Sequence, residues 1–196
     1  MCKDMEEIEV KFLNINPKEV GDELLRLGAN KLFDRLYKIK IFDYPDLRLN
    51  GEASWLRLRD EGDKITLSYK QRIGIKSVGG ETNDDGMKEI EIVVDSFDKT
   101  AELIYALGLV DKFYEEKRRV RYVLDDIEFD IDYMPELAPF LEIESDSWEK
   151  IDKAIELLGL DPKEKKIFSA FQIYALRGIN MLDYSEFRFS GSVKKI

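Results

Sequence analysis

Residues 7–12, EIEVKF, alternate charged and apolar side chains without interruption. A period of two is typical of a β-strand that buries one face and leaves the other polar. Every residue on the polar face of this stretch carries a charge, whereas an ordinary solvated strand face also carries Ser, Thr, Asn or Gln. The stretch therefore predicts a strand with one apolar and one fully charged face, and the rest of the chain is interpreted from it.

Six further segments repeat this alternation: residues 55–59, 65–70, 88–92, 117–124, 127–133 and 141–144. Another strand is expected within residues 36–42. The charged face of these strands carries both acids and bases. They are Glu7, Glu9, Glu89, Glu91, Glu128, Asp130, Asp132, Glu142 and Glu144, with Lys11, Arg57, Arg59, Lys70, Arg72, Lys117, Arg119 and Arg121. The opposite face is apolar and suits packing beneath amphipathic helices.

Capping residues and glycines mark the helices. Helices are predicted at residues 16–28, 96–108, 147–159 and 163–177, and a hairpin turn at 60–63. The Gly- and Asn-rich stretch 74–86 predicts a long loop between two strands, and its role as a lid or a plain loop is left open.

Length and composition limit the class of protein. The chain has 196 residues, of which 44% are hydrophobic and 37% charged, and this length fits one large domain. The formal net charge of -10 disfavours general binding to nucleic acid or an anionic membrane, because both are polyanions.

The absence of histidine excludes several chemistries. The sequence has no His and a single cysteine, Cys2, which excludes Ser-His-Asp and Cys-His catalysis, His-ligated metals and an intrachain disulfide. No secretory signal or spanning apolar run is present, so the expected location is the cytoplasm. Any chemistry must come from carboxylates, Lys, Arg, hydroxyls and metals that prefer oxygen ligands.

Two arrangements are compatible with the charged face. In the first, an open sheet turns the charges to bulk water, where each cross-strand ion pair contributes at most about 1 kcal/mol. In the second, the sheet closes and the charges point inward, which costs stability unless a ligand completes the interior. Because so many strands share the pattern, the second arrangement is favoured. Clustered Arg and Lys would bind phosphate oxygens, and paired carboxylates would bind Mg²⁺ or Mn²⁺.

The ordered charged residues resemble the CYTH superfamily of triphosphate tunnel metalloenzymes. The resemblance covers residues 7 to 144 and is looser beyond. Its motifs are E-x-E-x-K at 7–11, R-x-R at 57–59, Lys70, E-x-E at 89–91, K-x-R-x-x-Y at 117–122, Asp132 and a closing E-x-E at 142–144. Two stretches depart from the family pattern, namely 39–43, where many relatives have D-x-Y-F-D, and 133–135, where Trp-Pro is more usual.

The resemblance implies an α+β fold, a closed eight-stranded antiparallel β-barrel with helices outside. It implies a single domain over 1–196, with the barrel at about 5–145 and a helical region at about 146–196. It assigns Mg²⁺ or Mn²⁺ to Glu7, Glu9, Glu89, Glu91, Asp132, Glu142 and Glu144. It assigns the phosphates to Lys11, Arg57, Arg59, Lys70, Lys117 and Arg119. The expected catalytic residues are Glu9, Lys11 and Arg59.

The expected activity is metal-dependent hydrolysis of inorganic triphosphate or of an organic or nucleoside triphosphate. The alternative within the family is a class IV adenylyl cyclase, which forms cyclic AMP and pyrophosphate from ATP. A third alternative is a binder of polyphosphate or nucleotide without catalysis. The expected partner is a small triphosphate, with neither nucleic acid nor membrane, and homodimerisation is left open.

Overall fold

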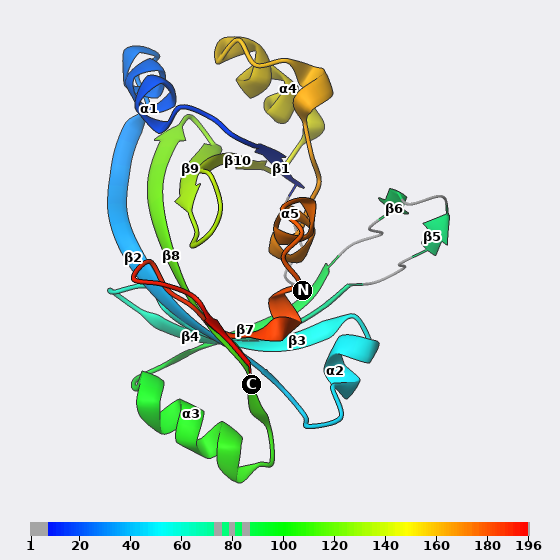
Figure 1. The fold of residues 1–196 in the computed structure, drawn as a ribbon. Coiled ribbons are helices and arrows are strands. Elements are labelled where there is room, and N and C mark those ends of the chain that lie inside the picture. The colour runs from blue at the N-terminus through cyan, green and yellow to red at the C-terminus, as the bar shows by residue number, and fades with distance from the viewer. Residues whose placement is uncertain (1–7, 73–75, 79–80, 84–86, 196) are drawn as a thin grey trace, which may run out of the picture. The chain divides into compact units, whose positions relative to one another are not determined.

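The computed structural model describes residues 8–72, 76–78, 81–83 and 87–195 (Figure 1). The strands are β1 (Ile8–Phe12), β2 (Asn30–Asp43), β3 (Ser54–Asp60), β4 (Ile65–Arg72), β5 (Lys76–Val78), β6 (Glu81–Asn83), β7 (Met87–Val94), β8 (Val110–Leu124), β9 (Ile127–Tyr133), β10 (Phe140–Ser145), β11 (Tyr184–Phe187) and β12 (Val193–Lys194). The helices are α1 (Pro17–Arg26), α2 (Arg48–Gly51), α3 (Phe97–Ala106), α4 (Trp148–Leu157) and α5 (Ala170–Leu176), with 3₁₀ turns η1 (Pro162–Glu164) and η2 (Met181–Asp183).

The strands follow the order β1-β10-β9-β8-β2-β3-β4-β7, with β11 on β8 and β12 on β11. Pairing is antiparallel from β1 to β8 and from β2 to β7, and parallel between β11 and β8. The predicted α+β class and the eight antiparallel strands are confirmed. Among the described residues, the path ends at β1 and β7, so closure of the barrel stays a prediction.

The chain divides into two compact units. Unit 1 comprises Met1–Leu36 and Lys117–Met181, and unit 2 comprises Tyr37–Glu116 and Leu182–Ile196. The long strands β2 and β8 contribute residues to both.

In unit 1, helices cover the apolar side of the strands. Val10, Ile143 and Ile131 share a buried cluster with Leu24 of α1 and Ile151 of α4. Fully burying such a side chain contributes about 1.5–3 kcal/mol. The packing leaves the charged residues of the same strands on the other side, because successive side chains alternate across a strand.

The predicted ends of the first three helices are confirmed. Asn16 caps α1 by accepting hydrogen bonds from the backbone of its first turn, and Ser96 and Ser147 cap α3 and α4. Beyond α1 and α3, Gly28 and Gly108 have φ of 91° and 89°, a conformation that costs glycine little.

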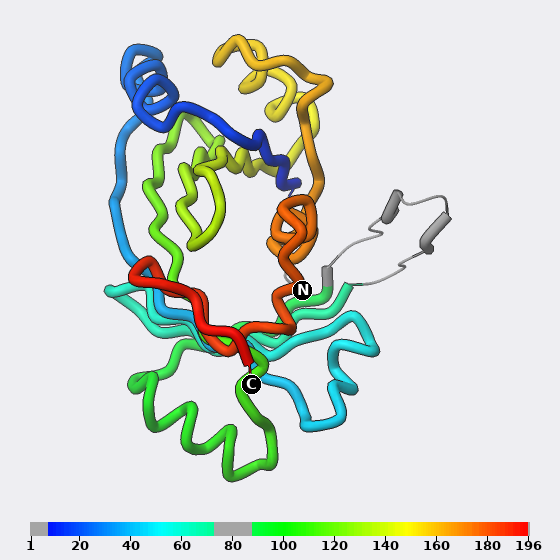
Figure 2. The backbone as a smooth tube through the Cα atoms, in the orientation of Figure 1, coloured from blue at the N-terminus to red at the C-terminus, as the bar shows by residue number. Residues whose placement is uncertain are grey.

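In unit 2, α3 covers the apolar side of β3 and β2. Leu58 and Phe42 are buried with Ala101 and Ile104 of α3, and α3 is drawn beneath these strands in Figure 1. The C-terminal segment, red in Figure 2, returns beside β8, where Glu186 pairs with Tyr114. The sequence did not predict this last strand, or α2.

The predicted helix over residues 163–177 was wrong in its first half. Between η1 and α5, Lys166 exchanges two backbone hydrogen bonds with Lys11 of β1, at 2.8 and 2.9 Å. Ser169 and Gln172 then form a capping box, so α5 begins only at Ala170. A charged segment with helical composition is extended here because it completes the hydrogen bonds of a strand.

The turn predicted at residues 60–63 is confirmed between β3 and β4. The loop predicted at 74–86 contains the short hairpin of β5 and β6. Its other residues lie outside the described ones, and β7 begins directly after it, at Met87. Within the described part of the chain, no helix is long and apolar enough to cross a membrane.

Asp43 fixes the start of α2 from outside the helix. Its buried carboxylate accepts hydrogen bonds from the backbone N–H groups of Leu49 and Asn50, both at 3.0 Å, whereas the N-cap residue Leu47 offers no side-chain bond. We expect Asp43→Ala to lower the free energy of unfolding by about 2 kcal/mol in urea denaturation. The exposed Asp46, which accepts a 3.3 Å bond from the Arg48 N–H, is the control. Asp46→Ala should change the free energy of unfolding by less than about 0.5 kcal/mol. An equal loss of stability in both variants would contradict the capping role of Asp43.

Candidate functional site

The strands of unit 1 align their charged residues in rows. Lys11 of β1 lies opposite Glu142 of β10, and Glu142 lies opposite Asp130 of β9. Asp130 in turn lies opposite Arg121 of β8. Because directly opposite residues point to the same side of a sheet, the four side chains form one continuous charged row.

Arg119 of β8 is the centre of this face. Its guanidinium donates to both carboxylate oxygens of Asp132, at 2.8 and 2.7 Å, and to Glu142 at 2.6 Å. It also forms an ion pair with Asp130 at 2.5 Å. Burial opposes the charged form, but Asp132, Glu142 and Asp130 outweigh it and hold the pKa of Arg119 well above its ordinary value.

Two lysines share the same carboxylates. Lys11 is buried and forms ion pairs with Glu9 and, at 3.2 Å, with Glu142. Burial lowers the pKa of Lys11, and Glu142 only partly offsets this effect. Lys117 lies 2.5 Å from Asp132. Burial alone would raise the pKa of Glu142, but Arg119, Lys11 and Lys117 hold it well below its ordinary value.

Carboxylates also cluster with one another, although Lys11 pairs with two members of the first cluster and Arg121 with two members of the second. Oxygen atoms of Glu9, Glu142 and Glu144 lie within 4.8 Å of one another, and so do those of Glu128, Asp130 and Glu144. Glu9 lies opposite Glu144, and Glu144 lies opposite Glu128, an arrangement of like charges that destabilises a sheet. A set of carboxylate oxygens fits the oxygen ligands that Mg²⁺ and Mn²⁺ prefer. The residues present therefore fit a divalent metal.

Unit 2 carries a second charged face, in which the bases are less completely neutralised. Lys70 pairs with Glu89 at 2.8 Å, but Arg57 approaches Glu89 and Glu91 only to 3.7 and 3.9 Å. Burial and the neighbouring Arg59 lower the pKa of Arg57 to about 10. The Nε atoms of Arg57 and Arg59 are buried and lack a hydrogen-bond partner. This face has an excess of buried donors and suits a polyanion.

A residue that the sequence did not single out holds Arg59. Glu61, directly after β3, lies 2.6 Å from the Arg59 guanidinium, and only 9% of its side chain is exposed. Two hydroxyl residues of β4, Thr66 and Ser68, lie on the same face and were also missed. The signal was present in the sequence, because both are an even number of residues from Lys70 on one strand.

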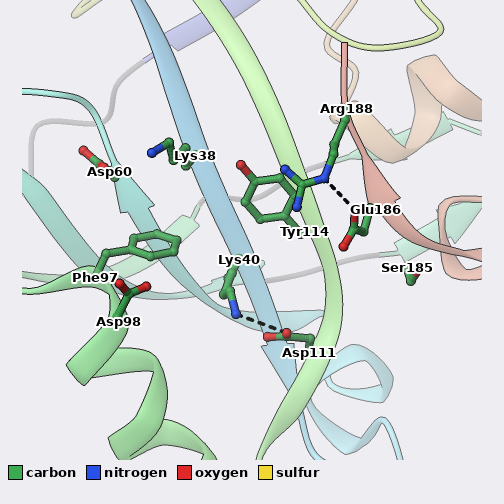
Figure 3. Close-up of a pocket in the computed structure, with 10 residues that line it drawn as sticks. All are labelled: Lys38, Lys40, Asp60, Phe97, Asp98, Asp111, Tyr114, Ser185, Glu186 and Arg188. Atoms are coloured by element: carbon green, nitrogen blue, oxygen red, sulfur yellow. Dashed lines mark hydrogen bonds and ion pairs between the residues drawn. The ribbon is translucent and has the colours of Figure 1, made fainter. Parts of the chain in front are cut away.

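A separate cavity of about 530 Å³ lies in unit 2 and contains none of the predicted site residues (Figure 3). Two of its bases are already paired, Lys40 with Asp111 at 3.3 Å and Arg188 with Glu186 at 2.5 Å. Its lining carries more acids than bases. The charges of the cavity therefore suit a polyanion less well than the face around Arg57.

The structure places the predicted site residues on two faces. In unit 1 they are Glu9, Lys11, Lys117, Arg119, Asp132, Glu142 and Glu144. In unit 2 they are Arg57, Arg59, Lys70, Glu89 and Glu91. Glu7 lies outside the described residues.

Comparison with known proteins gives a family and a fold. A family model described as the CYTH domain matches residues 5–167. A protein of Methanocaldococcus jannaschii named "Putative adenylate cyclase" is 29% identical over 155 residues, which are 78% of this chain and 85% of that protein.

Solved structures agree with this fold. A Pyrococcus horikoshii protein is 23% identical with a TM-score of 0.67, over 85% of this chain and 98% of that one. A Hippeastrum protein, named as a "putative adenylyl cyclase" with a dominant triphosphatase activity, is 16% identical with a TM-score of 0.61, over 90% and 98% of the two chains. At these identities the structures bear on the fold alone.

Proposed function

Because the chain belongs to the CYTH family, we propose that it is a divalent-metal-dependent triphosphatase. Its substrate would be inorganic triphosphate or an organic or nucleoside triphosphate, of which it hydrolyses a phosphoanhydride bond. The family assignment supports an enzyme of triphosphate chemistry, and the choice of hydrolysis is the proposal.

The observation that carries the proposal is the under-neutralised basic face of unit 2. Arg57 and Arg59 lie side by side with buried N–H groups that lack acceptors, and the pKa of Arg57 is lowered to about 10. Such an arrangement costs stability in the free protein. A bound polyphosphate would supply both the acceptors and the negative charge.

We assign the phosphates to the residues that the sequence predicted, Lys11, Arg57, Arg59, Lys70, Lys117 and Arg119. The carboxylates Glu9, Glu144 and Glu142 would hold the metal, since their oxygens already cluster. When bound, the metal would neutralise phosphate charge and make water a better nucleophile. We also keep the proposal that the metal is bound by the other predicted ligands, Glu7, Glu89, Glu91 and Asp132.

In the proposed reaction, water attacks the terminal phosphorus in line, the bond to the bridging oxygen breaks, and a diphosphate leaves. Lys11 and Arg59 would stabilise the charge that develops on the phosphoryl oxygens. The sequence has no His, so the proton of the attacking water would pass to a carboxylate or, with a metal bound, be lost to bulk water. Glu9 is our candidate because 43% of its side chain is exposed, whereas Glu142 is buried among bases.

The second candidate is the adenylyl cyclase reaction, favoured by the name of the Methanocaldococcus relative. In that reaction the ribose 3′-OH of ATP attacks the α-phosphorus and pyrophosphate leaves. Both reactions need the same phosphate and metal ligands. We rank hydrolysis first because the sequence shows no clear motif for recognising a base.

We expect the protein to convert tripolyphosphate to orthophosphate and pyrophosphate in the presence of Mg²⁺ or Mn²⁺. The products can be measured by ³¹P NMR. ATP and thiamine triphosphate should be assayed in parallel, with EDTA as the metal-free control. Cyclic AMP from ATP, without orthophosphate release from any substrate, would establish the cyclase instead. Tight binding of tripolyphosphate without turnover of any substrate would leave a binding protein and refute both reactions.

A further inference from the structure

Two hydroxyl groups of β4 are buried without a hydrogen-bond partner. Thr66 and Ser68 have no exposed surface, and their Oγ1 and Oγ atoms form no hydrogen bond to the part of the chain that the structure describes. Leaving a buried hydroxyl unsatisfied destabilises the folded protein. Most buried polar groups in proteins have a hydrogen-bond partner. Two neighbouring hydroxyls on one strand without partners therefore indicate a ligand that is absent from the structure.

The strand register places both hydroxyls beside the arginines of unit 2. Ser68 lies opposite Arg57 on β3, and Thr66 lies opposite Arg59. On its other side, Ser68 lies opposite Glu91 of β7. Directly opposite Cβ atoms are about 4.5–5.5 Å apart, so each hydroxyl lies on the charged face within reach of whatever its arginine binds.

Most of the unpaired groups in this small area can donate, the exception being Glu61 Oε1, which lies 2.6 Å from the Arg59 guanidinium. The Nε atoms of Arg57 and Arg59 are donors, and the two hydroxyls can each donate as well. Glu91 is close enough in register to accept from Ser68, yet no such bond forms. Four donors without acceptors, two of them on arginine cations, point to an absent anion with several oxygen atoms.

The spacing favours a chain of phosphates over a single one. Residues two apart on a strand are separated by about 6.6 Å, because each residue rises about 3.3 Å. One orthophosphate is too small to accept from both hydroxyls and both arginines at their separate positions, whereas consecutive phosphates of a polyphosphate can. The small side chains of β4 also leave room between the long bases of β3 and the acids of β7.

We propose that Ser68 and Thr66 form the floor of the phosphate site and donate hydrogen bonds to different phosphates of the bound triphosphate. This inference rests on the proposed function and names two binding residues that the charged motif does not include. The hydroxyls would thereby select for the length of the phosphate chain.

The test compares affinity with stability in the same variants. Ser68→Ala and Thr66→Val should each raise the Kd for tripolyphosphate about tenfold in calorimetry, because a hydrogen bond to a charged group is lost. The Kd for orthophosphate should change less. The melting temperature of the free variants should stay unchanged or rise, because each loses an unsatisfied buried hydroxyl.

Ser54 of β3 supplies the matched control. It is 2% exposed, but its hydroxyl donates to the Leu49 carbonyl at 3.0 Å. Ser54→Ala should therefore lower the melting temperature and leave the Kd for tripolyphosphate unchanged. Thr66→Ala, which also removes the hydroxyl, serves where Thr66→Val does not fold.

The outcomes separate this inference from the proposed function. Wild-type protein that binds no tripolyphosphate would overturn the proposed function and the inference with it. Wild-type binding that Ser68→Ala and Thr66→Val leave intact would overturn the inference alone. A fall in melting temperature with an unchanged Kd would show that the two hydroxyls are structural.

Discussion

Arg119→Ala is expected to lower the free energy of unfolding by about 3–5 kcal/mol at pH 7. Arg119 is buried and bonds to Asp132, Glu142 and Asp130. Removing the guanidinium would leave negative charge on these buried carboxylates without a compensating cation. An uncompensated buried charge is strongly destabilising. Urea denaturation at several pH values would measure the loss.

The neighbouring Arg118 is the control. It forms an equally regular pair with Asp34, with two bonds of 2.8 Å, but 47% of its side chain is exposed. Solvent screens such a pair, so Arg118→Ala should cost no more than about 1 kcal/mol. Similar losses in the two variants would show that burial does not set the strength of these ion pairs.

The pH dependence gives a second measure of Arg119→Ala. In the wild type the pKa of Glu142 is held well below its unfolded value, so its contribution to stability is present above pH about 4.3 and is lost as the pH falls through the folded pKa. Without Arg119, less positive charge opposes the effect of burial, so the pKa of Glu142 should rise above its wild-type value and protonation should relieve the unpaired charge. The difference in the free energy of unfolding between the wild type and the variant should therefore become smaller from pH 7 to pH 4. A difference that stays constant would exclude the unpaired charge of Glu142 as the cause of the destabilisation.

Should Arg119→Ala not fold, the double variant Arg119→Ala with Asp132→Asn tests the same cause. The second substitution removes one unpaired charge and should recover part of the loss, as expected for residues in one network. No recovery would contradict the electrostatic explanation.

The sequence predicted which side of each strand is charged, because parity along a strand is a local property. It gave Arg119 and Glu142 the same face, and the structure joins them at 2.6 Å. Parity alone could not select which of the acids Arg119 would bind. That choice depends on the register between β8, β9 and β10, which turns and packing set over long sequence distances.

Other features depended on tertiary contacts that no local pattern contains. Residues 163–169 have the composition of a helix, but Lys166 pairs with β1 instead. Asp43 appeared only as part of a departure from a family motif, and its function as a cap for α2 required the chain to turn back on itself. Ser68 and Thr66 looked like ordinary strand residues, because a sequence does not show that a hydroxyl is buried without a partner.

Glu9→Gln is expected to lower the turnover of tripolyphosphate with Mg²⁺ by about 100-fold or more, the usual contribution of a group that accepts a proton. The amide keeps the size of the side chain but removes the charge and the basic oxygen. Glu9 also belongs to the carboxylate cluster with Glu142 and Glu144, so the variant should bind Mn²⁺ more weakly in the absence of substrate. Electron paramagnetic resonance of free Mn²⁺ measures this second effect without relying on activity.

Glu156→Gln, on the exposed side of α4, makes the same change of charge at a distance from the cluster and should affect neither measurement. The two effects at Glu9 can be separated. Weaker Mn²⁺ binding with turnover restored by excess metal would assign Glu9 to the metal alone. Lost turnover with unchanged Mn²⁺ binding would assign it to proton transfer, and wild-type values for both would remove Glu9 from the site. Because Lys11 contacts both Glu9 and Glu142, the last result would move the candidate proton acceptor to Glu144, the remaining carboxylate of that cluster.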